Sequence, residues 1–383
     1  MATARVLSRP RKLTTVLAAR SENPVMSKRE RVVAAMSGGV DSAVAAAMLA
    51  EAGYEVIGVT MRLYEPTRTE RRAKSCCGIA DFDDARRSAA AIGIKHYVVN
   101  FEDAFRREVM DRFAEEYLRG RTPNPCVLCN NNLKLGTLWR YAKHLGARYV
   151  ATGHYARLVQ EADGPHLYRA TDRAKDQSYA LAQLNREQLA ALLLPLGGQV
   201  KARTRELAAQ FSMPVFDKPE SQDICFVEGG DYRDVVRRIR PEAEHPGEIV
   251  SSNGKTLGQH DGIASFTVGQ RRGLPANAGG DGPWYVTKIE PVTNKVVVGR
   301  RDELASGGLE GEDVNLLRPL PARVLAMPRY RARMAPAHAY LEGDRLQLRF
   351  DEPQRAVTPG QLVALYAEDG EEVVGAATIA RAL

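Results

Sequence analysis

The hexapeptide Ser37–Ser42 reads Ser-Gly-Gly-Val-Asp-Ser and has the residue types of a phosphate-binding loop. Its two glycines let the backbone approach an anion without an intervening Cβ, and its two serines add hydroxyl donors. Asp41 is suited either to capping a following helix or to holding Mg²⁺. The loop lacks the Gly-Lys-Ser/Thr of a Walker A motif, and therefore a lysine directed at a γ-phosphate, and it lacks the Gly-x-Gly-x-x-Gly of a dinucleotide fold. We favour a nucleotide site over a tight turn that binds nothing.

A buried strand and a buried helix flank this loop. Val32–Met36 is a continuous apolar run typical of a parallel sheet, and Ala43–Ala50 reads as a helix that ends near Gly53. The loop therefore leads into a helix N-terminus, where unpaired N–H groups and the helix dipole favour phosphate. Strands and helices alternate onward from here, which predicts an α/β fold with a doubly wound parallel sheet.

Ligands in such folds bind at the carboxyl ends of the strands. Met61 ends the predicted strand Tyr54–Met61, and its type suits an adenine contact and a core position equally. Gly153 follows the predicted strand Tyr149–Thr152, so its backbone is able to approach the nucleotide. His154 beside it is either a substrate contact or a structural residue.

Cys126 and Cys129 form a Cys-x-x-Cys within the segment 120–130, where two prolines predict an extended loop and exclude a helix. The pair fits half a zinc site, part of an iron–sulfur site or a thiol pair. A structural zinc would have to recruit Cys76 and Cys77, because a second Cys-x-x-Cys is lacking.

Two later segments carry polar groups without a clear role of their own. The charged stretch Arg173–Tyr179 reads as a solvated loop. Cys225 lies between Ile224 and Phe226, which fits a buried inert thiol, but the preceding Ser-Gln-Asp suits an exposed loop better.

Composition limits the class of protein. The chain has 383 residues, a formal charge of +7 and a pI of about 9.1, a balance that weakly favours a polyanionic partner. No apolar run approaches the ~20 residues of a membrane span, so we expect no membrane partner. Five cysteines, an odd number, argue against a disulfide scaffold and for a reducing, cytoplasmic location.

The chain divides into four predicted parts. Residues 1–30 form a basic extension, which we interpret as disordered or as the product of an upstream start codon rather than as a transit peptide. Residues 31–240 are the α/β domain. Short strands with Gly and Asn turns then predict a small central β domain over 241–300 and a C-terminal β-barrel over 301–383.

The hexapeptide resembles the PP-loop of ATP pyrophosphatases, which hold pyrophosphate and leave AMP on a substrate oxygen. Six further motifs follow it in one order, and the whole set resembles the tRNA-specific 2-thiouridylases of the MnmA type over essentially residues 31–383. The seven motifs are Ser37–Ser42, Asn124–Asn130, Ala151–His154, Lys175–Gln177, Ser221–Phe226, Gly269–Gly273 and Thr358–Gln361.

This resemblance implies a sulfurtransferase that uses ATP and Mg²⁺ to adenylate O2 of the wobble uridine of tRNA, after which sulfur replaces the activated oxygen. It implies that Cys225 carries a persulfide and that Cys129 activates or resolves it, with a transient disulfide between the two. It also implies a persulfide sulfur donor, either a relay protein or a cysteine desulfurase, and a C-terminal barrel that helps to bind tRNA.

The resemblance further assigns two sets of binding residues. The ATP site matches Ala35, Met36, Ser37, Gly38, Gly39, Val40, Asp41, Ser42, Met61 and Gly153. Contacts to tRNA or its target base match Asn124, Pro125, Cys126, His154, Lys175, Asp176, Gln177, Arg329, Tyr330 and Gln361.

One departure from the family pattern affects the mechanism. Many members have Asp where this chain has Cys126, so an acid–base role of that carboxylate does not transfer. Cys126, Cys129 and Cys225 together also suit three ligands of an iron–sulfur cluster, which stays a minority alternative. Two rival functions are another PP-loop ligase, which gives the cysteines no role, and a non-catalytic RNA-binding protein, which leaves the phosphate loop unexplained.

Overall fold

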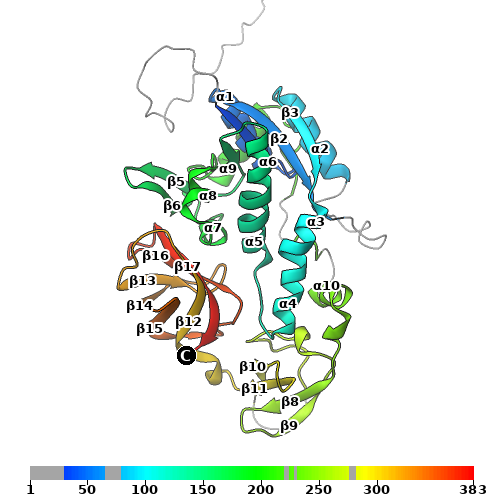
Figure 1. Ribbon diagram of the computed structural model, residues 1–383, viewed down its shortest axis with the longest axis vertical. Helices are drawn as coiled ribbons and strands as arrows, with labels where there is room; N and C mark the ends of the chain where they lie inside the picture. The colour runs from blue at the N-terminus through cyan, green and yellow to red at the C-terminus, as the bar shows by residue number, and fades with distance from the viewer. Residues whose placement is uncertain (1–29, 65–78, 220–223, 228–230, 276–281) are drawn as a thin grey trace, which may run out of the picture.

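The computed structural model describes residues 30–64, 79–219, 224–227, 231–275 and 282–383. The predicted N-terminal extension up to residue 29, together with Cys76, Cys77 and Ser221–Asp223, lies outside the described residues. Figure 1 shows three bodies: a parallel sheet with helices at the top, a β-barrel at the lower left and a small sheet at the bottom.

The first body is built on a parallel sheet of strand order β3-β2-β1-β4-β7. β1 lies in its centre and pairs in parallel with β2 on one side and β4 on the other. The strand order therefore reverses at β1, and the crevice at the carboxyl end of such a strand is where open α/β sheets bind ligands. The strands are β1 Arg31–Ala35, β2 Glu55–Arg62, β3 Lys95–Asn100, β4 Tyr149–Ala151 and β7 Leu192–Leu193.

Helices pack against this sheet and extend from it toward the other bodies (Figure 1). Two apolar clusters, one around Val33 and Val150 and one around Val32 and Val44, bury the central strands almost completely. The helices are α1 Val40–Glu51, α2 Ile79–Ala91, α3 Glu102–Phe105, η2 Arg106–Asp111, α4 Arg112–Leu118, α5 Pro125–Leu128, η3 Cys129–Leu138, α6 Trp139–His144, α7 Ser178–Leu181, α8 Arg186–Ala190, α9 Lys201–Gln210 and α10 Tyr232–Ile239.

The segment around Cys126 and Cys129 is helical, so the predicted extended loop over 120–130 was wrong there. α5 begins at Pro125 and continues without a break into the π-helix η3. Proline is favoured at the first helical position because its fixed φ suits a helix and its missing N–H would be unpaired there anyway. Asn124 caps this start, since its Oδ1 accepts a hydrogen bond from the Cys126 N–H at 3.1 Å.

Two smaller β elements follow the first strands. The hairpin of β5 Ala156–Glu161 and β6 Gly164–Arg169 projects from the parallel-sheet body. The central sheet has the order β10-β11-β8-β9 and packs around Val286, Val296 and Val298. Its strands are β8 Gly247–Ser251, β9 Thr256–His260, β10 Tyr285–Glu290 and β11 Lys295–Gly299, with short 3₁₀ turns η4 Pro241–Ala243, η5 Ile263–Ser265 and η6 Asp302–Leu304 around it.

The last body is a closed barrel, in which β12 pairs with both β15 and β17. Closure leaves no free strand edge. Its strands are β12 Ala305–Leu316, β13 Arg323–Met327, β14 Ala335–Glu342, β15 Arg345–Arg355, β16 Leu362–Tyr366 and β17 Val373–Ala382. The predicted fold class, a doubly wound parallel sheet followed by a small β domain and a C-terminal barrel, is confirmed.

Thr122 connects the three bodies just before the helix that carries the Cys-x-x-Cys. Its N–H donates to Pro359 O of the barrel at 2.8 Å, and its carbonyl accepts from Gln361 Nε2 at 2.6 Å. Its hydroxyl lies 3.2 Å from the hydroxyl of Thr267 in the central body. These contacts fix where α5 begins.

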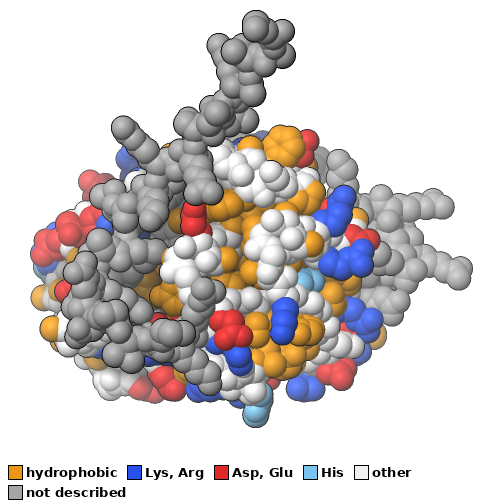
Figure 2. All heavy atoms as spheres, turned by 90° about the horizontal axis from the view of Figure 1, so that it is seen from above, with side chains coloured by type: hydrophobic (Ala, Val, Ile, Leu, Met, Phe, Trp, Pro, Cys, Tyr) orange, Lys and Arg blue, Asp and Glu red, His pale blue; other side chains and the backbone are white. Residues whose placement is uncertain are grey.

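Among the helices that the structure describes, none is long and apolar enough to cross a membrane. Figure 2, which views the molecule from the end that carries the parallel sheet, shows acidic and basic side chains interspersed, and the described residues form no continuous basic face on that side.

Candidate functional site

The hexapeptide Ser37–Ser42 closes on itself through its two serines. The Ser37 N–H donates to Ser42 Oγ at 3.1 Å, and that hydroxyl donates to Gly39 O at 3.1 Å. Gly39 is the N-cap of α1 and makes no side-chain cap, so the first N–H groups of the helix are left for an anion. Ala35 ends β1 directly before the loop, while Met36 and Val40 are buried under it.

Gly38 and Gly153 are required by close backbone packing at this loop. Gly38 has a φ of +75°, and a Cβ there would meet Asp81 O at 2.4 Å. A Cβ on Gly153 would lie 2.7 Å from the backbone carbon of Asp41 and 2.7 Å from the Ser42 nitrogen. The end of β4 therefore packs directly against the N-terminus of α1, and the structure brings Gly153 to the loop.

Two lysines distant in sequence reach the loop, although the hexapeptide itself contains none. Lys218 Nζ donates to Gly38 O at 3.0 Å and to the carboxylates of Asp81 at 2.5 Å and Asp84 at 2.7 Å. Burial acts to lower the pKa of Lys218, but its bonds to the two carboxylates outweigh burial and raise that pKa. Lys218 is therefore a firmly charged cation at the phosphate loop.

Lys201, the first residue of α9, is the second of these cations. Its Nζ contacts both carboxylate oxygens of Asp41, at 2.7 and 2.8 Å, and Tyr155 Oη donates to the same carboxylate at 2.9 Å. Sequence reasoning missed both lysines and Tyr155, because no spacing in the chain connects them with the loop. The carboxylate of Asp41 is directed at Lys201 and Tyr155, and it makes no side-chain cap to α1.

Met61 lies at the carboxyl end of β2, at the edge predicted for the nucleotide. It is partly buried and packs against two apolar clusters. Its position at the border of the core suits both roles that its sequence position left open.

Cys129 and Cys225 come from distant segments and pack against the same apolar cluster, which is built around Phe105, Phe113 and Phe226. Both thiols are half-buried, so Cys225 is neither fully buried nor on a fully exposed loop. The Tyr64 hydroxyl holds the segment of Cys225 by donating to its carbonyl at 2.8 Å. The structure therefore brings the two predicted sulfur-handling residues to one cluster, with no bond between them.

The charge of Lys134 acts on this region. Burial raises the pKa of Cys129, and the nearby ammonium of Lys134 opposes that rise. Burial lowers the pKa of His154 well below its usual range, and Lys134 lowers it further. His154 is therefore neutral, and its Nδ1 lies 2.8 Å from the hydroxyl of Thr152. Lys134 is anchored by a 2.9 Å bond to Asn130 Oδ1.

The three thiols of the iron–sulfur alternative do not form a single-ion site among the described residues. Among the described residues, one group of at least three His, Cys, Asp or Glu places its ligand atoms within 4.8 Å of one another, and it is Glu161, Asp163 and His166. Cys126 is exposed at the surface, whereas Cys129 is half-buried. A single metal ion shared by the three thiols is therefore not supported, whereas the sulfurs around a cubane cluster stand farther apart and the cluster stays an alternative.

Several residues that are predicted to contact tRNA make hydrogen bonds within the protein in this structure. The side chain of Asp176 is only 7% exposed and accepts hydrogen bonds from the Ala170 N–H and the Arg169 guanidinium, so the prediction of a solvated loop at Arg173–Tyr179 was wrong there. Gln177 Oε1 accepts from the Tyr155 N–H at 2.9 Å. Asn124 caps α5 and thereby places Pro125 and Cys126, and Gln361 holds Thr122.

Three other residues that are predicted to contact tRNA are at least partly exposed to solvent. Tyr330 is 40% exposed, and its ring centroid lies 5.8 Å from that of Tyr179. Arg329 is exposed and makes a long contact to the Arg355 carbonyl at 3.3 Å. Lys175 lies in the turn before α7, half-buried. Arg329 and Tyr330 are thus positioned on the barrel side of the helix that begins at Pro125.

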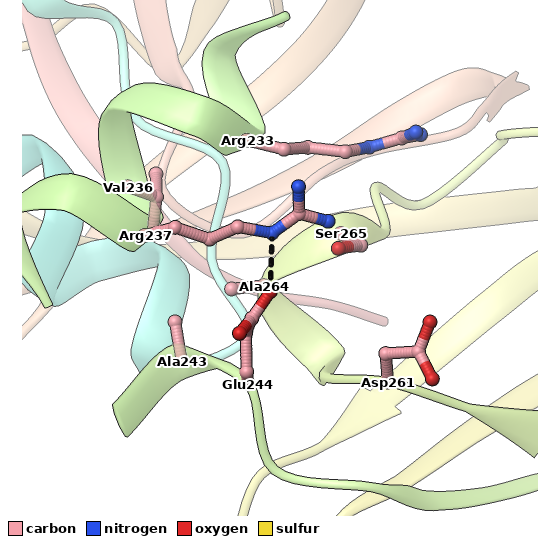
Figure 3. Close-up of a pocket in the computed structure, with 8 residues that line it drawn as sticks. All are labelled: Arg233, Val236, Arg237, Ala243, Glu244, Asp261, Ala264 and Ser265. Carbon is pink, nitrogen blue, oxygen red and sulfur yellow. Dashed lines mark ion pairs between the residues drawn. The ribbon is translucent and has the colours of Figure 1, made fainter. Parts of the chain in front are cut away.

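A small hollow beside α10 is separate from these residues. Figure 3 shows Arg237 and Glu244 facing one another across it, with an ion pair of 3.0 Å. Asp261 and Ser265 line the opposite side. No cysteine and no residue of the phosphate loop contributes to its lining, so it is not the candidate site.

Comparison with known proteins bears on the whole chain. Three family models match in series: the tRNA methyl transferase HUP domain over residues 30–229, the tRNA methyl transferase PRC-barrel domain over 233–300 and the aminomethyltransferase β-barrel domain over 307–379. The tRNA-specific 2-thiouridylase MnmA of Carboxydothermus hydrogenoformans is 47% identical over 93% of this chain and 99% of its own. That of Moorella thermoacetica is 48% identical over 90% and 98%.

The chain belongs to the tRNA-specific 2-thiouridylase family. The family models carry methyltransferase names and each covers one body, whereas the relatives carry the thiouridylase name and extend through all three bodies. A solved 4-thiouridine synthetase–RNA complex with bound ATP is a much more distant likeness, with a TM-score of 0.34 and 16% identity over 56% of this chain and 51% of that one.

Proposed function

We propose that this protein is a tRNA 2-thiouridylase, which replaces O2 of the wobble uridine with sulfur at the expense of ATP. The observation that carries the proposal is that one domain combines a phosphate loop with two thiols, Cys129 and Cys225, on a common cluster. The first feature serves activation of an oxygen and the second serves delivery of sulfur. The relatives named thiouridylase supply the substrate.

The first half-reaction activates the uridine. O2 attacks the α-phosphorus of ATP, pyrophosphate leaves, and the oxygen becomes part of an AMP ester that is a far better leaving group than a carbonyl oxygen. The N–H groups of the loop and the cations Lys201 and Lys218 are placed to hold the departing pyrophosphate. Lys201 would exchange its contact with Asp41 for the nucleotide.

The second half-reaction delivers sulfur. The terminal sulfur of a persulfide on Cys225 attacks C2, and AMP leaves with the former O2. Cys129 then attacks the Cys225 sulfur, the sulfur–sulfur bond breaks, and 2-thiouridine is released. The two cysteines are left as a disulfide, which a two-electron thiol reductant must reopen before another turnover.

The remaining site residues are part of this proposal. Ala35, Met36, Ser37, Gly38, Gly39, Val40, Asp41, Ser42, Met61 and Gly153 form the ATP site. Asn124, Pro125, Cys126, His154, Lys175, Asp176, Gln177, Arg329, Tyr330 and Gln361 serve the tRNA or its target base, several of them by holding the contact segments in place.

Three further elements belong to the same proposal. Mg²⁺ would be carried by the phosphates of ATP with Asp41 as its protein ligand, since within the described part of the chain Asp41 Oδ2 accepts a hydrogen bond only from Lys201 and keeps a second lone pair. A persulfide donor protein recharges Cys225, and the reaction takes place in the cytoplasm. The proposal keeps the predicted domain limits: residues 31–240 carry out the activation, and residues 241–300 and 301–383 form the two β bodies.

The test is to incubate the protein with radiolabelled ATP, with and without tRNA, and with a persulfide source. We expect pyrophosphate release only when tRNA is present, and free AMP and 2-thiouridine only when the sulfur source is added as well. A PP-loop ligase would release AMP with another acceptor, a methyltransferase or a plain RNA-binding protein would release none, and either result would overturn the proposal.

A further inference from the structure

The loop Gly269–Gly273, hereafter the arginine loop, lies between the turn after η5 and β10 and has no role in the mechanism above. Its sequence is Gly-Gln-Arg-Arg-Gly. The Gly269 N–H donates to Val286 O at 2.7 Å, and the Val286 N–H donates to Gln270 O at 2.9 Å. Gln270 Nε2 donates to Arg272 O at 2.9 Å. The backbone of the loop is therefore braced on both sides.

Both arginines of this loop are exposed. Within the part of the chain that the structure describes, neither Arg271 nor Arg272 has an ion pair or a side-chain hydrogen bond to the protein. Other arginines of this molecule are neutralised locally, as Arg121 is by Glu116 and Glu312. Two adjacent uncompensated guanidinium groups on a rigid loop are an anion-binding arrangement, because Arg presents a planar fork of donors that matches phosphate.

The position of the loop places its backbone near the segment that is predicted to face the target base. Thr267, just before the loop, contacts the hydroxyl of Thr122 at 3.2 Å. A Cβ on Gly269 would meet Ala356 Cβ of the barrel at 2.9 Å, so the loop packs closely between the central body and the barrel. Thr122 leads directly into Asn124 and Cys126. The arginine loop is thus at the junction from which the predicted target-base segment begins.

We propose that the arginine loop binds backbone phosphates of the tRNA beside the target uridine, which makes the central body part of the RNA-binding surface. This inference rests on the proposed function, since it takes tRNA as the ligand. The phosphates on either side of a uridine presented to Asn124–Cys126 are joined to its own ribose, and the loop adjoins the junction from which that segment begins.

The braced backbone lowers the conformational entropy that is lost when the loop binds an anion. A rigid loop loses little conformational freedom when it binds, so less of the interaction energy is lost to ordering. Among the described residues, the two guanidinium groups also have no carboxylate partner to give up. Each contact should release about one condensed counterion from the RNA.

The experiment measures tRNA affinity of the full-length protein at several salt concentrations. For the double variant Arg271→Ala/Arg272→Ala we expect the slope of log affinity against log salt to fall by about 1.4 to 1.8, since each phosphate contact contributes about 0.7 to 0.9. At 0.1 M salt this corresponds to a loss of roughly 25- to 60-fold in affinity. Restoring the charge with Arg271→Lys/Arg272→Lys should recover the slope and only part of the affinity, because Lys is not bidentate.

The matched control is Lys95→Ala/Lys255→Ala, which also removes two exposed positive charges, one at the start of β3 and one in the turn before β9. It should leave slope and affinity near those of the parent. An unchanged slope in the arginine variant, or an equal loss in the control, would overturn the inference while the parent still thiolates tRNA. A parent that neither binds tRNA nor forms 2-thiouridine would instead overturn the proposed function.

Discussion

Alanine at Gly39 separates phosphate binding from folding more sharply than any other change in the loop. Gly39 has a φ of −97°, which alanine adopts without strain, and a Cβ at this position would have one near neighbour, the Ser37 hydroxyl at 3.4 Å. Alanine is less favourable than glycine at an N-cap by roughly 0.5 to 1 kcal/mol, but it also restricts the unfolded chain, which offsets about 0.4 to 1 kcal/mol, so the unfolding free energy should change little. In the nucleotide complex, however, that methyl group would stand between the backbone N–H groups and the phosphates.

The expected cost to catalysis follows from distance. A methyl group that moves the phosphates by about 1 Å from the loop should slow adenylation by roughly 100-fold, as small misplacements do in positioned reactions. Gly38→Ala is the matched comparison, because its φ of +75° and the 2.4 Å approach of Asp81 O must destabilise the fold itself. That variant should lose about 1 to 3 kcal/mol of stability.

The assay combines thermal unfolding with pyrophosphate release at saturating tRNA, measured over a range of ATP concentrations. Gly39→Ala should unfold at nearly the parental temperature and show strongly impaired adenylation. If Gly39→Ala releases pyrophosphate at the parental rate and with the parental KM for ATP, then the phosphates do not approach this loop and the reasoning is refuted.

Two further predictions concern charged groups. Burial acts to raise the pKa of Asp84, but Lys218 and Arg87 outweigh burial and hold that pKa below its usual value. The ionised Asp84 therefore stabilises the fold above about pH 4, and this contribution is lost as the pH falls through the lowered pKa. Lys218→Met should therefore unfold more easily than the parent at neutral pH, with the gap in unfolding free energy narrowing in acid; a gap that is constant down to about pH 2 would contradict the pairing. Burial raises the pKa of Cys129 and Lys134 opposes that rise. In a variant with serine at the other four cysteines, Cys76, Cys77, Cys126 and Cys225, alkylation of Cys129 should therefore keep accelerating above about pH 8.5. Lys134→Met should shift the pH dependence of Cys129 alkylation to higher pH, and Lys134→Arg should restore it. If neither substitution changes this pH dependence, Lys134 does not influence the thiol.

The sequence was most informative where local pattern and topology act together. The apolar run before Ser37 and the small-residue loop after it predicted a central parallel strand that leads into a helix N-terminus, and the strand order indeed reverses there. Alternating strands and turns near the C-terminus predicted the closed barrel. These features depend on residue periodicity and on turn chemistry, both of which are visible in a single chain.

The parts that escaped prediction depend on long-range contacts or on competing local rules. Lys201 and Lys218 reach the loop from well over a hundred residues away, and no spacing announces them. Two prolines in the segment 120–130 predict a loop, but proline at the first helical position favours a helix when Asn124 caps it. Asp176 looked solvated among charged neighbours, yet it is buried by the hydrogen bonds that it makes to Arg169 and Ala170.

The most direct test of the central claim follows 2-thiouridine per tRNA, pyrophosphate release and labelled AMP bound to tRNA in cysteine variants of the full-length protein, with iron content measured in the same samples. Cys225→Ser should form no 2-thiouridine while still releasing pyrophosphate and leaving AMP on the tRNA, because serine cannot carry persulfide sulfur but the phosphate loop is untouched. Cys126→Ser should retain thiolation if the thiols act separately, and its loss together with bound iron in the parent would favour the cluster. Normal 2-thiouridine formation by Cys225→Ser would contradict the account as a whole.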